Sequence, residues 1–351
     1  MRSILVCETQ VPFVDGGAER LVRGLVGELR RHGYRAETVS IPFKSYPKGE
    51  LLAQAAMWRL VDLSESNYES VDAVITTKFP NYFVRHPNKV TWLLHQYRAI
   101  YDLCGTPFSE FTDVEADVRL RDRLIALDTE VLAESKRLFS ISRTTTARLA
   151  RYNGLTAEPL YHPPLLAGTL AAGPFGDYVL SVGRLEQNKR VELVVRALAL
   201  TDRSVRLVIA GHGGERSRLE ALASKLAVAD RIVFAGIIDD RQLVDLYAGA
   251  LAVVFPPLDE DYGYVTLEAM LSAKPVVTCT DSGGPLEFVL DGETGCVTAP
   301  DPLEVARALE RLAAQPGEAA RMGRAGRDRA LAMLPSWDVV VETLLAKKAS
   351  T

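Results

Sequence analysis

Residues 177–200 have the sequence DYVLSVGRLEQNKRVELVVRALAL. The apolar run DYVLSVGR predicts a buried strand that ends near a glycine, and RVELVVRALAL predicts a helix after it. Further along the chain, VRLVIAG, RIVFAG, ALAVVFPP and AKPVVTCT predict more strands, separated by helical segments. Strands and helices that alternate so regularly predict a parallel sheet built from βαβ units.

The amino-terminal half repeats this organisation. Strands are predicted at SILVCET, AETVSI, VDAVITT, KVTWLLH and RLFSIS. The apolar spacing in AERLVRGLVGELRRHG predicts a helix. Residues 159–177 are rich in proline, glycine and alanine, which indicates a linker. We therefore expect an α/β protein with two Rossmann-like domains, at residues 1–165 and 166–335, whose parallel sheets face a central cleft.

The composition disfavours several classes of function. The chain has 351 residues and a net charge of −4, whereas a protein that grips nucleic acid is usually basic. No apolar run approaches the roughly 18 residues of a membrane helix, so we expect a soluble cytoplasmic protein. The four scattered cysteines indicate free thiols. GxGxxG is absent after the first strand of either half, which disfavours an NAD-dependent enzyme.

The stretch DEDYGYVTLEAM, residues 259–270, holds the main binding candidates. An apolar helical spacing follows Gly263, so a helix N-terminus with free amides, suited to phosphate, is expected there. The amides concerned belong to Tyr264, Val265 and Thr266. Glu260 and Glu268 lie about two helical turns apart, and carboxylates accept hydrogen bonds from sugar hydroxyls. Together these features describe a site for a nucleotide sugar; the alternative is an acidic helix start that merely suits the helix dipole.

Two cations in SVGRLEQNKR complete this candidate site. Arg184 and Lys189 follow a predicted strand, where fixed cations can neutralise the charge that grows on a departing diphosphate. A divalent metal held by Asp259 and Asp261 could do the same. Because the cation pair makes a metal redundant, no metal is expected. The alternative is that both cations are solvated surface residues.

The first half offers fewer candidates. His95 ends the predicted strand KVTWLLH, where it can hydrogen-bond a donor sugar or assist charge development, or equally be a packed structural histidine. Gly16 and Gly17 precede the first helix and would allow a phosphate or sugar to approach closely; the alternative is a plain turn. Lys78, at another strand end, is a candidate contact for an acceptor.

These motifs together resemble glycosyltransferase family 4. Over residues 178–298 the resemblance rests on GRLEQNK, AGHGG, FAGII, the Glu260–Glu268 pair, AKPVV and GGPLEFVLDGETG. In the first half it is looser and rests on GGAERLV, WLLHQYR and SISRTTTARL. The resemblance implies the GT-B fold and metal-independent transfer from a nucleotide sugar with retention of configuration. It also implies that a helix at about residues 336–348 packs back onto the first domain. Tyr262 departs mildly from the phenylalanine that is commoner in the family.

The resemblance also implies roles for individual residues. Arg184 and Lys189 would bind the diphosphate, together with the amides after Gly263, and Glu268 would bind the ribose. Glu260 and His95 would lie by the transferred sugar, and the backbone near Ile237 would face the base. We expect a UDP-sugar donor and a hydroxyl-bearing acceptor, either a saccharide, a glycolipid or a secondary metabolite.

Three alternatives remain open at this point. The enzyme could be a sugar-nucleotide epimerase or a phosphorylase of the same fold, or the protein could bind nucleotide sugars without turnover. An arginine-rich first helix could touch an anionic lipid surface, or simply present a solvated basic side. Its arginines, with one just beyond it, are Arg20, Arg23, Arg30, Arg31 and Arg35. Neither the acceptor nor the oligomeric state follows from the sequence.

Overall fold

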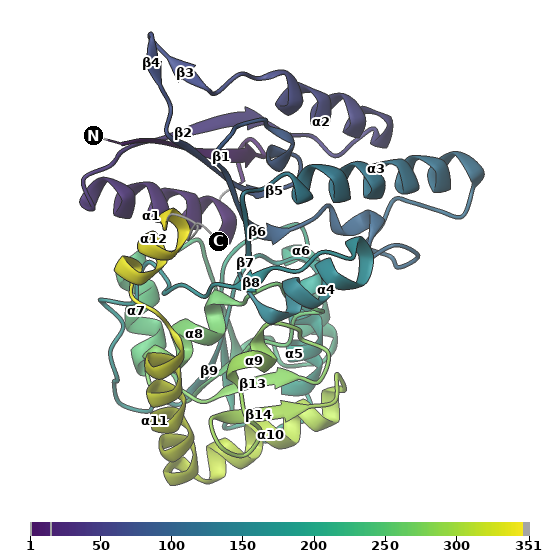
Figure 1. The fold of residues 1–351 in the computed structure, drawn as a ribbon. Helices are drawn as coiled ribbons and strands as arrows, with labels where there is room; N and C mark the ends of the chain where they lie inside the picture. The colour runs from purple at the N-terminus through teal and green to yellow at the C-terminus, as the bar shows by residue number, and fades with distance from the viewer. Residues whose placement is uncertain (1, 15, 347–351) are drawn as a thin grey trace. The chain divides into compact units, whose positions relative to one another are not determined.

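Two parallel sheets organise the chain, one in each of two units (Figure 1). The computed structural model describes residues 2–14 and 16–346. The first unit comprises Met1–His162 and Pro335–Thr351, and the second comprises Pro163–Leu334. The prediction of an α/β protein with two Rossmann-like domains and parallel sheets is confirmed, and the cleft between them stays a prediction.

The sheet of the first unit is parallel throughout, as its continuous apolar strands predict. Its strands are β1 (Ser3–Gln10), β2 (Arg35–Pro42), β5 (Ala73–Lys78), β6 (Lys89–His95), β7 (Arg137–Ser140) and β8 (Glu158–Pro159). They lie in the order β2-β1-β5-β6-β7-β8, so the direction of strand addition reverses between β1 and β5. This reversal is a topological switch point, where ligands usually bind such sheets. A small hairpin, β3 (Glu65–Ser66) and β4 (Glu69–Ser70), stands apart.

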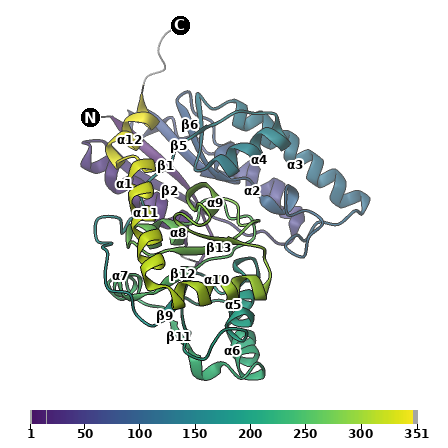
Figure 2. The ribbon, with the colours of Figure 1, turned by 90° about the horizontal axis from the view of Figure 1, so that it is seen from below.

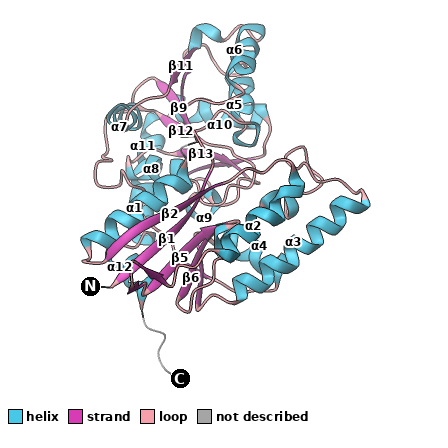
Figure 3. Cartoon of the chain, turned by 90° about the horizontal axis from the view of Figure 1, so that it is seen from above, coloured by secondary structure: helices cyan, strands magenta, loops and turns pink. Residues whose placement is uncertain are grey.

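Helices flank this sheet (Figure 3). They are α1 (Gly17–Arg31), α2 (Leu51–Leu60), α3 (Glu115–Ala133) and α4 (Arg143–Asn153), with the short turns η1 (Lys48–Glu50), η2 (Asn81–Phe83) and η3 (Arg98–Ile100). The apolar residues of α1 recur at helical spacing, and Leu21, Leu25 and Leu29 are buried. Truncating one such leucine to alanine would cost about 2–5 kcal/mol.

The last helix, α12 (Trp337–Leu345), also belongs to the first unit. Figures 1 and 2 show it beside α1. Trp337 lies 6.4 Å from Trp92 and stacks on His162 at 5.8 Å, measured between ring centroids. Residues 347 and 348 of the predicted helix lie outside the described residues.

The sheet of the second unit has the strand order of nucleotide-binding folds. Its strands are β9 (Tyr178–Val182), β10 (Arg206–Ala210), β11 (Ile232–Gly236), β12 (Ala252–Val254), β13 (Val276–Cys279) and β14 (Gly295–Thr298). They lie in the order β11-β10-β9-β12-β13-β14 and are all parallel. Numbered within the unit, this is the doubly wound order 3-2-1-4-5-6, with its switch point between β9 and β12.

Helices also surround the second sheet (Figure 1). They are α5 (Val191–Leu198), α6 (Arg216–Lys225), α7 (Asp240–Gly249), α8 (Tyr264–Leu271), α9 (Pro285–Phe288), α10 (Pro302–Ala314) and α11 (Pro316–Met333), with turns η4 (Gln187–Lys189) and η5 (Ala229–Arg231). Helix α5 packs with α6 and α10, and α8 packs with α9 and α11. Helix α8 is thereby held by two neighbouring helices as well as by the sheet.

Candidate functional site

The switch point of the second unit collects most of the predicted site. The loop after β9 carries Arg184 and Lys189, and the loop after β12 carries Glu260 and Gly263. Because β9 and β12 are hydrogen-bonded neighbours, their carboxyl ends lie side by side. The order of the strands alone therefore brings the predicted cations and acids to one edge of the sheet.

Lys189 and Glu260 contact each other directly. The Nζ atom of Lys189 lies 2.5 Å from Oε2 of Glu260, and 15% and 21% of the two side chains are exposed. Nζ also lies 6.0 Å from the centroid of the Phe255 ring, where the ring face attracts a cation. The ammonium group is therefore held at the edge of the sheet before any ligand binds.

Backbone contacts fix the loop that carries Glu260. The Glu260 amide donates to the Ser282 carbonyl at 2.9 Å, and the Gly284 amide donates to the Glu260 carbonyl at 2.7 Å. Gly283 has a φ of +69°, and a Cβ added there would lie 2.6 Å from the Glu260 carbonyl oxygen. Only glycine fits this position without strain. The two glycines that begin the GGPLEF motif thus hold the loop that carries Glu260 in place.

Arg190, which was not among the predicted site residues, is a second anchor of this loop. Its Nη2 atom donates to the Pro257 carbonyl at 2.9 Å and to Oδ1 of Asp281 at 2.8 Å. The Asp259 amide donates to the Asp281 carbonyl. Across the described part of the chain, no three His, Cys, Asp or Glu side chains gather as metal ligands would, Asp259 and Asp261 included.

Helix α8 begins where the sequence predicts, with Gly263 as its N-cap. Gly263 has a φ of +85°, and a Cβ there would lie 3.0 Å from Cγ of Pro285. The Tyr262 ring is buried and packs edge-on against Tyr264 and Phe288. Tyrosine therefore fills the place where phenylalanine is commoner. The Thr266 amide, one of the three predicted to bind phosphate, instead donates to the Gly263 carbonyl at 3.0 Å. An anion at this helix N-terminus would therefore be met by the two amides before it.

The far end of the candidate site lies on the first turns of α8. The side chains of Thr266 and Glu268 are buried, and that of Val265 is half-buried. The Tyr247 hydroxyl, from α7, donates to Oε2 of Glu268 at 2.8 Å. A hydrogen bond to a charged acceptor is stronger than a neutral one, so it orients this carboxylate. No sequence pattern pointed to Tyr247.

Arg184 and Ile237 are the exposed members of the predicted set in the second unit. Arg184 pairs with Oε1 of Glu186 at 2.8 Å, and nearly half of its side chain is exposed. Ile237 follows β11 directly and is 76% exposed. In the strand order, β11 lies two strands from β9, so both residues follow strands at the same edge of the sheet. Both are accessible to a ligand.

In the first unit, the loops at the switch point between β1 and β5 are tied together by Glu19. Its Oε2 accepts a hydrogen bond from the Gly16 amide at 2.9 Å, and its Oε1 lies 3.0 Å from Nζ of Lys78. Gly16 has a φ of −144°, which any residue can adopt, and Gly17 is the first residue of α1. Glu19 was not among the predicted site residues, although its place three residues after the N-cap is typical of a capping box.

His95 is the last residue of β6, beside Lys78 in the strand register. Its Nδ1 atom lies 2.7 Å from the Gln96 carbonyl oxygen. Since a carbonyl oxygen only accepts hydrogen bonds, Nδ1 carries the hydrogen and Nε2 is the acceptor in the neutral ring. The ring is half-buried. His95 thus presents one defined nitrogen at the carboxyl edge of the first sheet.

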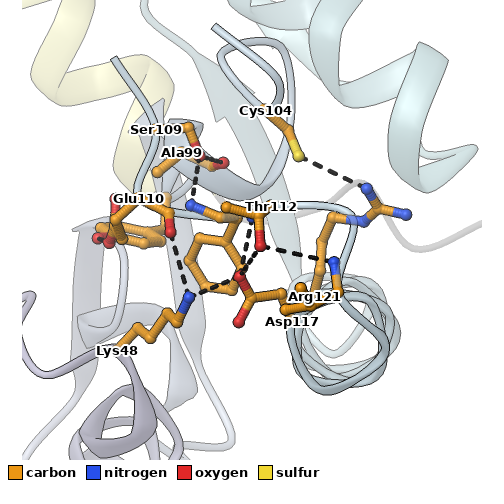
Figure 4. Close-up of polar contacts among 11 residues, drawn as sticks. Lys48, Ala99, Cys104, Ser109, Glu110, Thr112, Asp117 and Arg121 are labelled. Carbon is orange, nitrogen blue, oxygen red and sulfur yellow. Dashed lines mark hydrogen bonds and ion pairs between the residues drawn. The ribbon is translucent and has the colours of Figure 1, made fainter. Parts of the chain in front are cut away.

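The segment that follows His95 is pinned by a network around Asp117 (Figure 4). Nζ of Lys48 lies 2.5 Å from Oδ2 of Asp117 and donates to the Glu110 carbonyl at 3.2 Å. The Thr112 amide and hydroxyl both donate to the same Asp117 oxygen at 2.8 Å. The hydrogen bonds from Lys48 and then Thr112 lower the pKa of Asp117 to about 2. The network fastens residues 110–112 to α3 and η1.

Comparison with known proteins shows that the second unit is similar to sugar-transferring enzymes. Residues 175–329 match the family described as "Glycosyl transferases group 1". Alpha-1,3/1,6-mannosyltransferase ALG2 of Homo sapiens is 32% identical over 167 residues, which are 43% of this chain and 40% of that protein. D-inositol 3-phosphate glycosyltransferase of Acidothermus cellulolyticus is 37% identical over 183 residues, 48% of this chain and 40% of that protein. The chain thus spans less than half the length of these relatives.

Solved structures extend the similarity to the whole chain at the level of fold. Sucrose-phosphate synthase from Thermosynechococcus elongatus has a TM-score of 0.79 at 20% identity and covers 98% of this chain and 97% of its own. Anabaena Alr3699/HepE, in complex with UDP and glucose, has a TM-score of 0.72 at 17% identity, with coverages of 99% and 100%. These similarities show the GT-B fold. Within residues 2–14 and 16–346, no helix is both long enough and apolar enough to cross a bilayer.

Proposed function

We propose that the protein is a retaining, metal-independent glycosyltransferase of family 4 that transfers a sugar from a UDP-sugar to an acceptor hydroxyl. The Lys189–Glu260 pair, at the switch point of a nucleotide-binding sheet, carries this proposal. The family match of residues 175–329 and the UDP and glucose bound by a protein of the same fold add support.

In this proposal the donor lies along the edge of the second sheet. The diphosphate binds Lys189, Arg184 and the amides at the start of α8, since fixed cations and a helix N-terminus both favour anions. Glu268, oriented by Tyr247, accepts hydrogen bonds from the ribose. The sugar and the base are bound by the remaining candidates: Glu260 and His95 for the sugar, Gly16 and Gly17 near it, and Ile237 for the base.

The transfer step follows from the charges in the donor site. The bond between the sugar C1 and the diphosphate oxygen breaks, and the acceptor oxygen bonds to C1 on the same face. The acceptor proton passes to the departing diphosphate oxygen, so the products are the glycoside and UDP. Donor binding moves Lys189 from Glu260 to the diphosphate, which leaves Glu260 free to accept from a sugar hydroxyl. Lys189 then neutralises the negative charge that grows on the diphosphate and so lowers the barrier.

The acceptor is a saccharide, a glycolipid or a secondary metabolite that binds the first unit. Lys78 lies at the carboxyl edge of that unit's sheet, and residues 110–112 are fastened by the Lys48–Asp117 pair. The arginines of α1 give this unit a basic helix, which would favour weak contact with an anionic membrane surface.

Donor binding tests the proposal without knowledge of the acceptor. The protein is titrated calorimetrically with UDP and incubated with UDP-glucose, UDP-galactose and UDP-N-acetylglucosamine, with and without EDTA. We expect UDP to bind and one donor to release UDP slowly in both conditions. The Lys189→Ala variant should bind UDP about tenfold more weakly, a loss of about 1.4 kcal/mol.

Arg203→Ala is the matched control for this change. Arg203 pairs with Asp230 in the same unit, but 78% of its side chain is exposed, so its loss should leave UDP affinity within about twofold. Unchanged affinity in Lys189→Ala would refute the donor site, and loss of activity with EDTA would refute the metal-free mechanism. Conversion of a donor into an isomeric nucleotide sugar without acceptor would identify an epimerase instead.

A further inference from the structure

A buried carboxylate in the first unit has no part in the mechanism above. Asp128 lies in α3 and its side chain is fully buried. The Tyr101 hydroxyl donates to its Oδ2 at 2.7 Å, whereas its Oδ1 has no hydrogen-bond partner. Burying a carboxylate with so few partners is costly, and apolar residues of similar volume would be at least as stable. The packing of the core alone therefore does not explain Asp128.

A chain of buried hydrogen bonds connects Asp128 with the end of β6. Nδ2 of Asn153, in α4, lies 3.3 Å from the Tyr101 hydroxyl oxygen and donates to it. Nε2 of Gln96 donates to Oδ1 of Asn153 at 3.0 Å. The side chains of Tyr101, Asn153 and Gln96 are all buried. A second branch, from Nδ2 of Asn153 to Thr129 at 2.7 Å, ties the chain back to α3.

The chain ends at the residue that orients His95. Gln96 uses its side chain to bind Asn153 and its carbonyl to accept the hydrogen bond from Nδ1 of His95. The peptide that sets the histidine tautomer is thus fixed by α4 and, through Tyr101, by Asp128. Burial, and then the Asp128 charge, raise the pKa of Tyr82 in η2.

We propose that Asp128 is a positioning residue for His95: through Tyr101, Asn153 and Gln96 it holds the turn after β6 so that Nδ1 stays protonated and Nε2 stays the acceptor nitrogen of the ring. This inference rests on the proposed function only for the role of His95 in sugar binding. The geometric claim, that the network sets the tautomer and orientation of the ring, concerns the free protein. A network whose members are all buried transmits such a change because its partners have no water to replace them.

Nuclear magnetic resonance of the histidine rings tests the geometric claim without any substrate. The chain has five histidines, so ¹⁵N-histidine labelling gives a readable spectrum, and His95→Gln identifies the His95 signals. The wild type should show the tautomer protonated at Nδ1. Asp128→Leu and Tyr101→Phe should each shift the ring nitrogens toward a mixture of tautomers. Asp128→Asn keeps an acceptor for Tyr101 and should restore the wild-type signals.

Thr76→Val is the control for the loss of a buried hydrogen bond. Thr76 pairs with Thr91 at 2.8 Å inside the same sheet and has no bond in the chain from Asp128. It should leave the His95 signals unchanged. If both Asp128→Leu and Tyr101→Phe leave these signals at their wild-type positions, the inference is wrong. Because Tyr101→Phe removes one oxygen atom, it keeps the test decisive even if Asp128→Leu does not fold.

Kinetics then separate the two proposals. In an enzyme that transfers sugar, Asp128→Leu and Tyr101→Phe should lower kcat about tenfold, since a misplaced group near the reaction weakens catalysis. The affinity for UDP should stay within twofold of the wild-type value, because all proposed contacts of UDP lie in the second unit and none involves His95. Shifted His95 signals in a protein without transferase activity would support the positioning role and refute the proposed function. Unshifted His95 signals in an active transferase would support the proposed function and refute the positioning role of Asp128.

Discussion

At the scale of single residues, the charged groups of the proposed donor site are already paired in the free protein. Lys189 would be a flexible surface cation if nothing held it, but Glu260 and the Phe255 ring restrain it at the sheet edge. Restraining the ammonium group in the free protein reduces the entropy that binding must remove. The same pairing keeps Glu260 from being a buried charge without a partner. The ion pair thus compensates the charges of both side chains while no ligand is bound.

The Tyr247–Glu268 hydrogen bond leads to a prediction about the ribose. Tyr247→Phe removes the donor to Oε2 of Glu268 and should weaken UDP binding several-fold, because the carboxylate loses its orientation. Pyrophosphate, which has no ribose, should bind the variant as it binds the wild type. Competition titrations with UDP and pyrophosphate measure both affinities. An equal loss for the two ligands would mean that Glu268 does not contact the ribose.

Asp128 leads to a prediction about stability and pH. Burial raises its pKa to about 7 in the folded protein, well above its usual value of 3.8. The folded state therefore binds a proton more tightly than the unfolded state, and the stability gained at low pH is lost as pH rises through 7. From pH 5 to pH 8 this amounts to about 2–3 kcal/mol. Asp128→Asn should lack this loss.

The measurement compares the two proteins at both pH values. Tryptophan fluorescence reports the first unit, because Trp58, Trp92 and Trp337 all belong to it. Relative to the wild type, Asp128→Asn should gain stability between pH 5 and pH 8, and the titration of every other group should cancel in the difference. A constant difference between the two proteins would show that Asp128 is ionised throughout this range.

At the scale of elements, the strongest patterns in the sequence were those with a local cause. The start of α8 was predictable because Gly263 and the apolar spacing after it are a local signal of a helix start. The strands β8 and β14 were not predicted. Both are short strands at the edges of their sheets, and β8 lies partly in the segment taken as a linker. Edge strands need fewer apolar residues, so their pattern is weak.

Contacts between elements were less predictable than the elements. Strand ends pointed to Arg184, Lys189 and His95, because the carboxyl ends of parallel strands share one edge. Nothing in the sequence indicated that Lys189 would meet Glu260, or that Tyr247 on α7 would meet Glu268 on α8. Such pairs depend on how helices pack over the sheet, and spacing along the chain does not encode it.

The Lys48–Asp117 pair leads to a prediction about the segment after β6. Lys48→Met should loosen residues 110–112, because they lose their connection to η1 and keep only the Thr112 bonds to Asp117 on α3. Hydrogen exchange should increase at the Thr112 amide, and the KM for the acceptor should rise while UDP affinity stays constant. Arg119→Met is the control, since Arg119 forms an exposed pair with Glu115 on the same helix. Unaltered exchange in Lys48→Met would exclude this restraint.

At the scale of the whole molecule, one rule of parallel sheets accounts for the position of most candidates. Both sheets reverse their direction of strand addition once, and most candidate residues lie after the strands near those two switch points, whereas Ile237 follows β11, two strands from β9. The alternation of strands and helices already indicated that the candidates follow the carboxyl ends of parallel strands, although the order of the strands was not known. The order itself depends on right-handed crossovers and on helix packing, which the pattern of apolar residues does not specify.

The C-terminal helix leads to the last prediction, since α12 follows the second unit in the chain but belongs to the first. Trp337 anchors it between Trp92 and His162, and Arg137 donates to the Ala346 carbonyl at 3.1 Å. Trp337→Ala should destabilise the first unit by about 2 kcal/mol, less than a fully buried tryptophan because its side chain is half-exposed. The fluorescence of Trp58 and Trp92 should therefore change at a lower urea concentration than in the wild type.

UDP binding provides the contrast for this variant. The proposed contacts of UDP all lie in residues 184–268 of the second unit, so Trp337→Ala should bind UDP with an affinity within twofold of the wild type. Val339→Ala serves as the control on the same helix, because the Val339 side chain is exposed and its loss should change stability little. If Trp337→Ala unfolds at the wild-type urea concentration, α12 contributes nothing to the first unit. If instead UDP affinity falls in parallel with stability, the donor site depends on α12 as well as on the second sheet.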